Sequence, residues 1–193
     1  MRQPCSWGAA AVLVFLSSAT GLSQDPKAVS MQREAMKKLS FLAGQWKGES
    51  WLEFVPGQRN ASLGTETVQS KLDGLLLIID GIFRRKLGEK EAGDVVHQAF
   101  TVISYDEKAK RYRFQAYTDR GTYTEAEAKV SDGKLVWGFR IPRFGEVRYT
   151  ITVTEKGQWS EIGEVSQDGK QWRKFFGMTL ERVKGEGKGE IPR

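Results

Sequence analysis

The 193-residue sequence is poor in the residues that most metal proteins and nucleophilic enzymes rely on. It has one cysteine, Cys5, and one histidine, His97. One cysteine and one histidine are too few for the common structural zinc sites, which use four such ligands, and no calcium-loop spacing is present. The sequence also has neither a Gly-x-Ser-x-Gly elbow nor a glycine-rich phosphate loop. It therefore predicts no metal site, no cofactor and no catalytic residue, and favours a binding protein over an enzyme.

Long apolar runs are also absent, apart from one near the start. Arg2 precedes the apolar residues 9–16, and small residues follow up to Ser23. This order is typical of a secretory signal peptide, and a membrane-spanning helix needs a longer run, about 20 residues. We expect residues 1–23 to be cleaved and the protein to be periplasmic or secreted in a bacterial source. Cys5 would leave with them, so the mature chain would have no disulfide and no transmembrane segment.

The charge balance is mildly basic, with a net charge of +6. This excess suits anionic ligands, lipid headgroups or a cell-wall polymer, but a solvated surface explains it more simply. Residues 108–114 interleave basic and aromatic side chains, as some single-strand nucleic-acid sheets do. Here the two kinds fall on opposite faces of the expected strand. The sequence therefore predicts no nucleic-acid partner.

Regularly spaced glycines divide the second half of the chain. Gly121, Gly133, Gly145, Gly157 and Gly169 recur every twelve residues. Glycine supplies the positive φ of hairpin turns, and apolar and polar residues alternate between the turns, as in antiparallel strands with one dry face. Further strands are predicted at about 45–54, 61–72, 75–86, 94–105 and 170–182.

Short strands joined by tight turns predict an all-β, up-and-down antiparallel meander barrel of about ten strands. Ahead of it, Met31, Ala35, Leu39 and Leu42 recur at helical spacing, which predicts a short helix over 31–42 that closes one end of the barrel. The expected divisions are a signal peptide at 1–23, a linker and amphipathic helix at 24–43, the barrel domain at 44–183 and a disordered tail at 184–193.

The inward positions of the predicted strands include several small residues, which leave space for a ligand. They are Gly48, Ser50, Ala116, Thr124, Ala126 and Ala128. The alternative is that large aromatic side chains from other strands fill this space and make the interior solid.

The segment 39–49, Leu-Ser-Phe-Leu-Ala-Gly-Gln-Trp-Lys-Gly-Glu, resembles the helix-to-strand junction of calycin-type barrels. These are the lipocalins, the fatty-acid-binding proteins and the ten-stranded nitrobindin-like barrels. Leu72-Asp73-Gly74 before an apolar third strand is similar to a family of small exported bacterial proteins without an assigned function. The resemblance covers residues 38–183.

This resemblance implies that Trp46 plugs the closed end of the barrel and that Arg182 of the last strand stacks on it. Nitrobindin-like barrels bind haem through a histidine on a late strand. The corresponding stretch here, residues 172–181, contains none. Met178 is expected to pack in the core. We therefore expect no haem.

The first hypothesis is an exported barrel that binds a small, mostly apolar or amphipathic molecule. The predicted lining is Trp46, Phe114, Trp137, Phe139, Tyr149 and Phe176, with Lys174 as an anchor for an acidic head group.

The second hypothesis is an enzyme or haem-type protein that uses the same cavity with His97, although a half-buried strand residue explains this histidine more simply. Glycoside chemistry would need two facing carboxylates, and the sequence gives no separations. The candidates are Glu66, Asp80, Glu161 and Glu164. The third hypothesis is a structural or envelope-associated protein whose barrel is solid.

Overall fold

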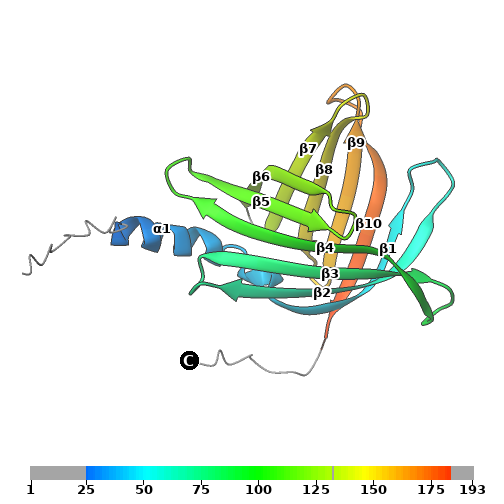
Figure 1. Cartoon of the computed structure of the whole chain (residues 1–193), viewed down its shortest axis with the longest axis horizontal. Coiled ribbons are helices and arrows are strands. Elements are labelled where there is room, and N and C mark those ends of the chain that lie inside the picture. Colours follow the sequence, from blue (N-terminus) through cyan, green and yellow to red (C-terminus); the bar gives the residue numbers. More distant parts are fainter. Residues whose placement is uncertain (1–24, 132, 184–193) are drawn as a thin grey trace, which may run out of the picture.

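The computed structural model describes residues 25–131 and 133–183. The predicted signal peptide and C-terminal tail lie outside the described residues. Ten antiparallel strands form a closed barrel in which each strand pairs with its neighbours in sequence and β1 pairs with β10 (Figure 1). The strands are β1 (Gly44–Leu52), β2 (Asn60–Lys71), β3 (Leu76–Lys86), β4 (Ala92–Asp106), β5 (Arg111–Thr118), β6 (Tyr123–Ser131), β7 (Lys134–Ile141), β8 (Gly145–Val153), β9 (Trp159–Ser166) and β10 (Arg173–Arg182). The predicted ten-stranded up-and-down barrel is confirmed.

The helical segment before the barrel begins earlier than expected and is divided in two. α1 spans Pro26–Lys37 and is followed by the 3₁₀-helix η1 (Ser40–Leu42). Asp25 caps α1 by accepting a hydrogen bond from the backbone N–H of Lys27, at 2.9 Å, and proline suits the first helical position. Met31, expected on the apolar face, is 40% exposed. The expected helix over 31–42 is therefore corrected at its start, which lies at Pro26, and by the break between Lys37 and Ser40.

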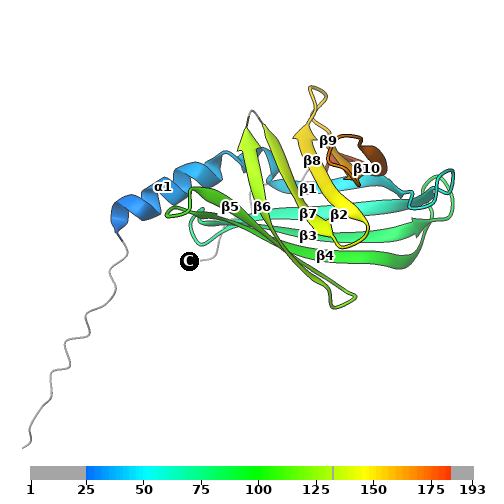
Figure 2. The same cartoon turned by 90° about the horizontal axis from the view of Figure 1, so that it is seen from above.

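The closed end of the barrel is sealed by the last turn of α1 and by η1. Met36, Leu39 and Leu42 are buried there around Trp46. The Trp46 indole N–H donates to the Leu42 carbonyl at 2.8 Å, and Trp159 meets its ring edge-on at 5.6 Å. The first turns of α1 project away from the barrel (Figures 1 and 2).

Two long-range contacts fix α1 against the barrel. The Tyr112 hydroxyl donates to the Ala35 carbonyl at 2.7 Å. Arg33 pairs with the carboxylate of Asp73 at 2.8 Å and donates to its carbonyl at 2.9 Å. Asp73 belongs to the β2–β3 turn. This turn therefore lies at the closed end. Successive turns of a meander alternate between the two ends of the barrel, so the opposite, open end is formed by the loops 53–59, 87–91, 119–122, 142–144 and 167–172.

One junction of the barrel is much shorter than the others. β6 and β7 pair only from Ala128–Trp137 to Ser131–Lys134, next to their shared turn. Beyond this point β6 pairs with β5 alone and β7 with β8 alone. Figure 1 shows β7 and β8 rising away from β5 and β6. We call the unpaired stretch between residues 123–127 and 138–141 the seam.

Candidate ligand site inside the barrel

A column of aromatic rings lines one wall of the interior. The Phe114 and Trp137 rings stack with centroids 4.0 Å apart, and Trp137 and Tyr149 stack at 4.5 Å. Phe176 meets Tyr149 edge-on at 5.9 Å, and Phe139 lies 5.9 Å from Trp137. The structure thus brings together five of the residues that the sequence pattern placed in the lining. We call these five residues the aromatic column.

The aromatic column covers some of the small residues that were expected to leave space. Phe114 and Trp137 lie on β5 and β7, whose axes are about 10 Å apart because β6 runs between them. Their rings stack only by leaning over Ala126 and Ala128 of β6, which are 9% and 3% exposed. At this wall the expected free space is corrected, since neighbouring aromatics fill it.

Two carboxyl groups face the interior from other strands. The Glu66 carboxylate lies against Gly81 of β3, where an added Cβ would come within 2.6 Å of Oε2. Glu161 of β9 pairs with the buried residues Ile151 and Met178. The other two candidate carboxylates lie outside. Asp80 is exposed, and Glu164 has the opposite parity on β9 and accepts a 2.8 Å hydrogen bond from Arg148.

Burial disfavours the charged form of both inward carboxyls. It raises the pKa of Glu66 well above its ordinary value, and the negative charges of Glu161 and Asp80 raise it further. Burial also raises the pKa of Glu161 to about 8. The indole N–H of Trp159 partly offsets this rise, although its geometry falls short of a formed hydrogen bond. With a pKa of about 8, Glu161 holds its proton near pH 7 and can donate as well as accept a hydrogen bond.

Three buried polar atoms have no hydrogen-bond partner among residues 25–131 and 133–183. They are Glu66 Oε2 and the indole nitrogens of Trp137 and Trp159. An unsatisfied buried donor or acceptor costs about 1–3 kcal/mol, and folded proteins have few of them. Two of these three atoms belong to groups described above: Glu66 Oε2 to an inward carboxyl, and the Trp137 indole nitrogen to the aromatic column.

The interior is packed at the closed end and accessible nearer the open end. Trp46, Trp159 and Leu180 at the closed end are at most 1% exposed. By contrast, Tyr149 and Glu161 keep accessible surface although their strand positions point inward. The open half of the barrel is therefore less tightly packed than the closed end.

His97 also faces the interior, but away from the aromatic column. It pairs with Phe83 across β3 and β4, and the two rings lie 5.9 Å apart. Burial lowers the pKa of His97, with opposing smaller effects from Asp119 and Arg120. The imidazole is therefore neutral near pH 7. Among the described residues, no group of three or more His, Cys, Asp or Glu side chains could hold a metal ion.

Lys174 does not join the aromatic column. A β-bulge between Lys174 and Phe176 breaks the alternation of β10. As a result, Lys174 is exposed and pairs with Glu164, while Phe175 is buried. The interior thus presents carboxyls where the sequence pattern had suggested a cation.

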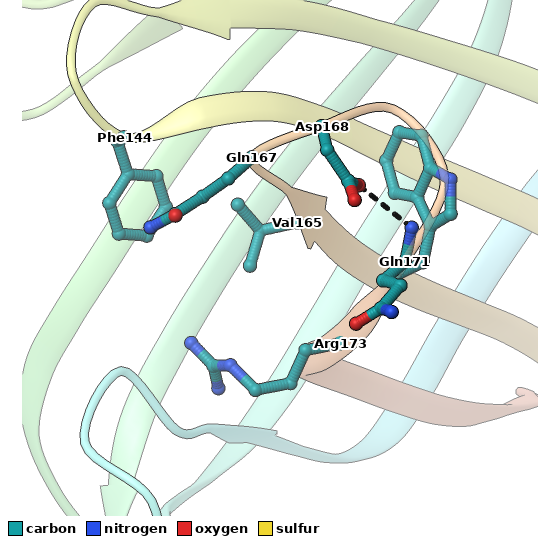
Figure 3. Close-up of a pocket in the computed structure, with 7 residues that line it drawn as sticks. Phe144, Val165, Gln167, Asp168, Gln171 and Arg173 are labelled. Carbon is teal, nitrogen blue, oxygen red and sulfur yellow. Dashed lines mark hydrogen bonds between the residues drawn. The ribbon is translucent and has the colours of Figure 1, made fainter.

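A surface depression of about 460 Å³ lies at the open end, between the β7–β8 and β9–β10 loops (Figure 3). Its lining residues are Phe144, Val165, Gln167, Asp168, Gln171, Trp172 and Arg173. Asp168 accepts backbone hydrogen bonds from Gln171 and Lys170, which lower its pKa. Arg173 donates to the Glu53 carbonyl at 3.2 Å. These polar groups already stabilise the loops, and sequence reasoning had not singled out the depression.

A closed ten-stranded meander, plugged by a tryptophan at one end and lined with aromatics inside, defines a calycin-like β-barrel. Its fold is similar to that of Rv2717c from M. tuberculosis, with a TM-score of 0.56 and 11% sequence identity over 78% of this chain and 98% of that one. No protein-family model and no curated protein matches the sequence. Within the described residues, no helix is long and apolar enough to span a membrane.

Proposed function

We propose that this protein is an exported barrel that binds a small, mostly apolar molecule in its open half. The observation that carries the proposal is the aromatic column, whose members Trp137 and Tyr149 lie at inward strand positions without being fully buried. Covering such apolar surface contributes about 25 cal/mol for each Å² removed from water. A calycin-like barrel is compatible with this role.

The geometry of the column restricts how a ligand lies against it. The Trp137 and Tyr149 rings are nearly parallel, at 11°, and belong to adjacent strands. The two rings stack along the direction that leads from one strand to the next, so each ring plane is perpendicular to that direction. The edges of the rings, and not their faces, therefore point into the barrel. A flat ligand therefore meets ring edges, which favours the edge-to-face contacts that aromatic groups prefer.

Export and family membership are further parts of the proposal. The charged, apolar and small segments within residues 1–23 support a signal peptide. N-terminal sequencing of the mature protein should give a start near Leu22 or Gln24, and a full-length chain in the cytoplasm would contradict export. The segments 39–49 and 72–74 support membership of the small exported bacterial barrels described above.

Native mass spectrometry of protein purified from its own host tests the binding proposal. We expect an added mass that disappears under denaturing conditions and that decreases in Tyr149→Ala. Trp51→Ala is the matched control, because Trp51 lies outside the barrel below the Arg59 guanidinium. A bare protein mass, with nothing recovered by solvent extraction, would contradict binding.

The second candidate function is a solid structural barrel. The observation that favours it is the contact of Phe114 with Trp137 above Ala126 and Ala128, which fills one wall. A solid core gives no reason for two inward carboxyls, because burying a polar group without a partner costs several kcal/mol, on the order of 2–7. The same mass measurement separates the two functions.

A further inference from the structure

Three loops at the open end are joined by contacts that leave their tips exposed. In the β1–β2 loop, the Glu53 carbonyl accepts a hydrogen bond from Arg173 at 3.2 Å, and the Phe54 ring stacks on Phe175 of β10 at 5.8 Å. Arg173 also borders the surface depression, together with Phe144 of the β7–β8 loop (Figure 3). These loops therefore form one continuous part of the barrel mouth, which we call the rim. The loops of the rim are residues 53–59, 142–144 and 167–172.

The β1–β2 loop of the rim has an apolar tip. Phe54 and Val55 are 57% and 54% exposed, and Pro56 follows them. At the end of β7, Ile141 is 36% exposed and precedes Pro142. Single exposed apolar residues are ordinary on protein surfaces. Adjacent ones at the tip of a loop are instead typical of a surface that contacts a partner or a membrane.

Basic residues outnumber acidic ones in the rest of the rim and in the strand ends beside it. Residues 139–146 and 167–174 include five basic and two acidic residues. One acidic residue, Glu146, pairs with Arg140 at 3.5 Å, and the other, Asp168, accepts hydrogen bonds from backbone N–H groups of its own loop. The remaining basic residues, all exposed, are Arg143, Lys170, Arg173 and Lys174. The rim thus carries a positive charge beside its apolar tip.

Basic residues also occur at the closed end, in turns that include Lys108 and Lys156. Charge alone therefore does not select the rim. In those turns an acidic residue directly precedes each lysine, Glu107 in one and Glu155 in the other. The rim differs because its excess of positive charge lies beside an exposed apolar tip and next to the less tightly packed half of the barrel.

We propose that the rim docks on the surface of a lipid bilayer that contains anionic lipids. In this arrangement Phe54 and Val55 enter the head-group layer, and the basic residues of the rim lie beside lipid phosphates. A bilayer surface offers an apolar phase and a negative potential together, whereas a soluble polyanion satisfies only the cations. Charge complementarity and the apolar tip therefore favour the same occupant.

This inference goes beyond the proposed function, because docking does not require a bound ligand. Combined with that function, it places the mouth of the barrel against the phase in which an apolar molecule dissolves. Such a molecule would then pass between bilayer and barrel with little of its surface exposed to water, where exposure is unfavourable.

Vesicle flotation with the mature protein tests docking. The N-terminus is determined first, so that the apolar residues 9–16 do not contribute to binding. The probes are vesicles of phosphatidylcholine alone and vesicles in which about a quarter of the lipid is phosphatidylglycerol. We expect the anionic vesicles to bind at least about tenfold more tightly, and we expect most of this binding to be lost when NaCl is raised from about 0.1 M to about 0.5 M.

Two pairs of variants compare the two ends of the barrel. Lys170→Glu reverses a charge of the rim and should weaken binding to the anionic vesicles by about tenfold. Lys156→Glu is its matched control, because Lys156 is also exposed beside a turn glycine, but at the closed end. Val55→Ser should weaken binding at least about threefold. Its control, Leu72→Ser, changes a residue that is 67% exposed in the closed-end β2–β3 turn and should have no effect.

A fluorescent label measures the orientation directly. Once Cys5 has been removed with the signal peptide, the chain has no cysteine, so Val55→Cys and Leu72→Cys can each carry one environment-sensitive label. On anionic vesicles we expect the emission of the label at position 55 to move to shorter wavelength, because this label leaves water. The emission of the label at position 72 should stay unchanged.

Four results would overturn the inference: equal binding to both kinds of vesicle, binding to neither, a wavelength shift confined to the label at position 72, or retention on soluble polyglutamate without binding to vesicles. The last would assign the rim to an acidic polymer instead. None of these results bears on ligand binding, which the mass measurement tests separately. Because the wild-type protein and the two labels give independent readings, the test does not depend on the folding of any one variant.

Discussion

The Arg182 guanidinium lies 4.1 Å from the centre of the Trp46 indole, and the two residues are register partners across the β1–β10 junction. Arg182 also donates to the carbonyls of Phe41, at 3.0 Å, and Ala43. One side chain thus links the last strand, the first strand and the turn that seals the closed end. This confirms the stacking that the resemblance to calycin-type barrels implied.

Replacing Trp46 should be among the most damaging single changes in the barrel. Trp46 is 1% exposed and contacts both Trp159 and the Leu42 carbonyl. Trp46→Ala should therefore lower the free energy of unfolding by about 3–5 kcal/mol, as measured by urea denaturation. Trp51 is the control. It lies on the outer face over Gly177, so Trp51→Ala should cost only about 1 kcal/mol. A reversed order would contradict the register of β1.

The contact between Arg182 and Trp46 should appear as an energetic coupling. Arg182→Ala removes a cation–π contact and two hydrogen bonds to carbonyls, and should cost less than Trp46→Ala. In a double-mutant cycle the two losses should be non-additive by about 0.5–2 kcal/mol. Strict additivity would mean that the stacking contributes no stability.

Glu161 should make the protein less stable as the pH rises. Its pKa is raised from 4.5 to about 8 on folding, so between these values the folded chain holds a proton that the unfolded chain releases. The free energy of unfolding then falls with increasing pH. The full shift corresponds to about 5 kcal/mol, which sets the order of magnitude of the loss between pH 5 and pH 9.

Urea denaturation at pH 5, 7 and 9 measures this loss. Glu161→Gln should flatten the profile and stabilise the protein most at pH 9, whereas Glu164→Gln should retain the wild-type slope. Glu66 contributes with the same sign, because burial raises its pKa as well, so some slope should persist in Glu161→Gln. Identical profiles for Glu161→Gln and the wild type would contradict the inward placement of Glu161.

Added hemin should not bind stoichiometrically. The late strand has no histidine, and His97 lies against Phe83, away from the aromatic column. A titration followed at the Soret band should therefore show no sharp saturating shift. A shift that disappears in His97→Ala would instead support the haem or enzyme hypothesis.

Most of the fold could be predicted because its signals are local. The alternation of apolar and polar residues and the spacing of the glycines gave ten strands, and Gly157 and Gly169 adopt φ values of +75° and +72° in their turns. The predicted helix began five residues too far along the chain, at Met31 instead of Pro26. The prediction followed the spacing of apolar residues and not the N-cap residue Asp25 and the proline after it. Only the last turns of this segment are buried, so its periodicity did not mark where it begins.

The candidate site could be predicted only in part. Strand parity correctly gathered Phe114, Trp137 and Tyr149, since no irregularity interrupts β5, β7 or β8. It wrongly placed Lys174 on the inner face, because an alternation of apolar and polar residues does not reveal the bulge in β10. The inward placement of Glu66 and Glu161 follows from parity as well, but parity does not give the burial that raises their pKa values.

The seam changes how the barrel is best described. Because β6 and β7 pair only beside their turn, the closed barrel resembles a rolled sheet whose edges are β6 and β7 and whose two central strands are β1 and β2. The first and last strands thus lie side by side in the interior of the sheet. A protease cut in the turn between Ser131 and Lys134 would leave every long ladder intact, while trimming β1 or β10 would divide the sheet in its interior. Amide hydrogens of residues 123–127 and 138–141 that face the seam should exchange with solvent first.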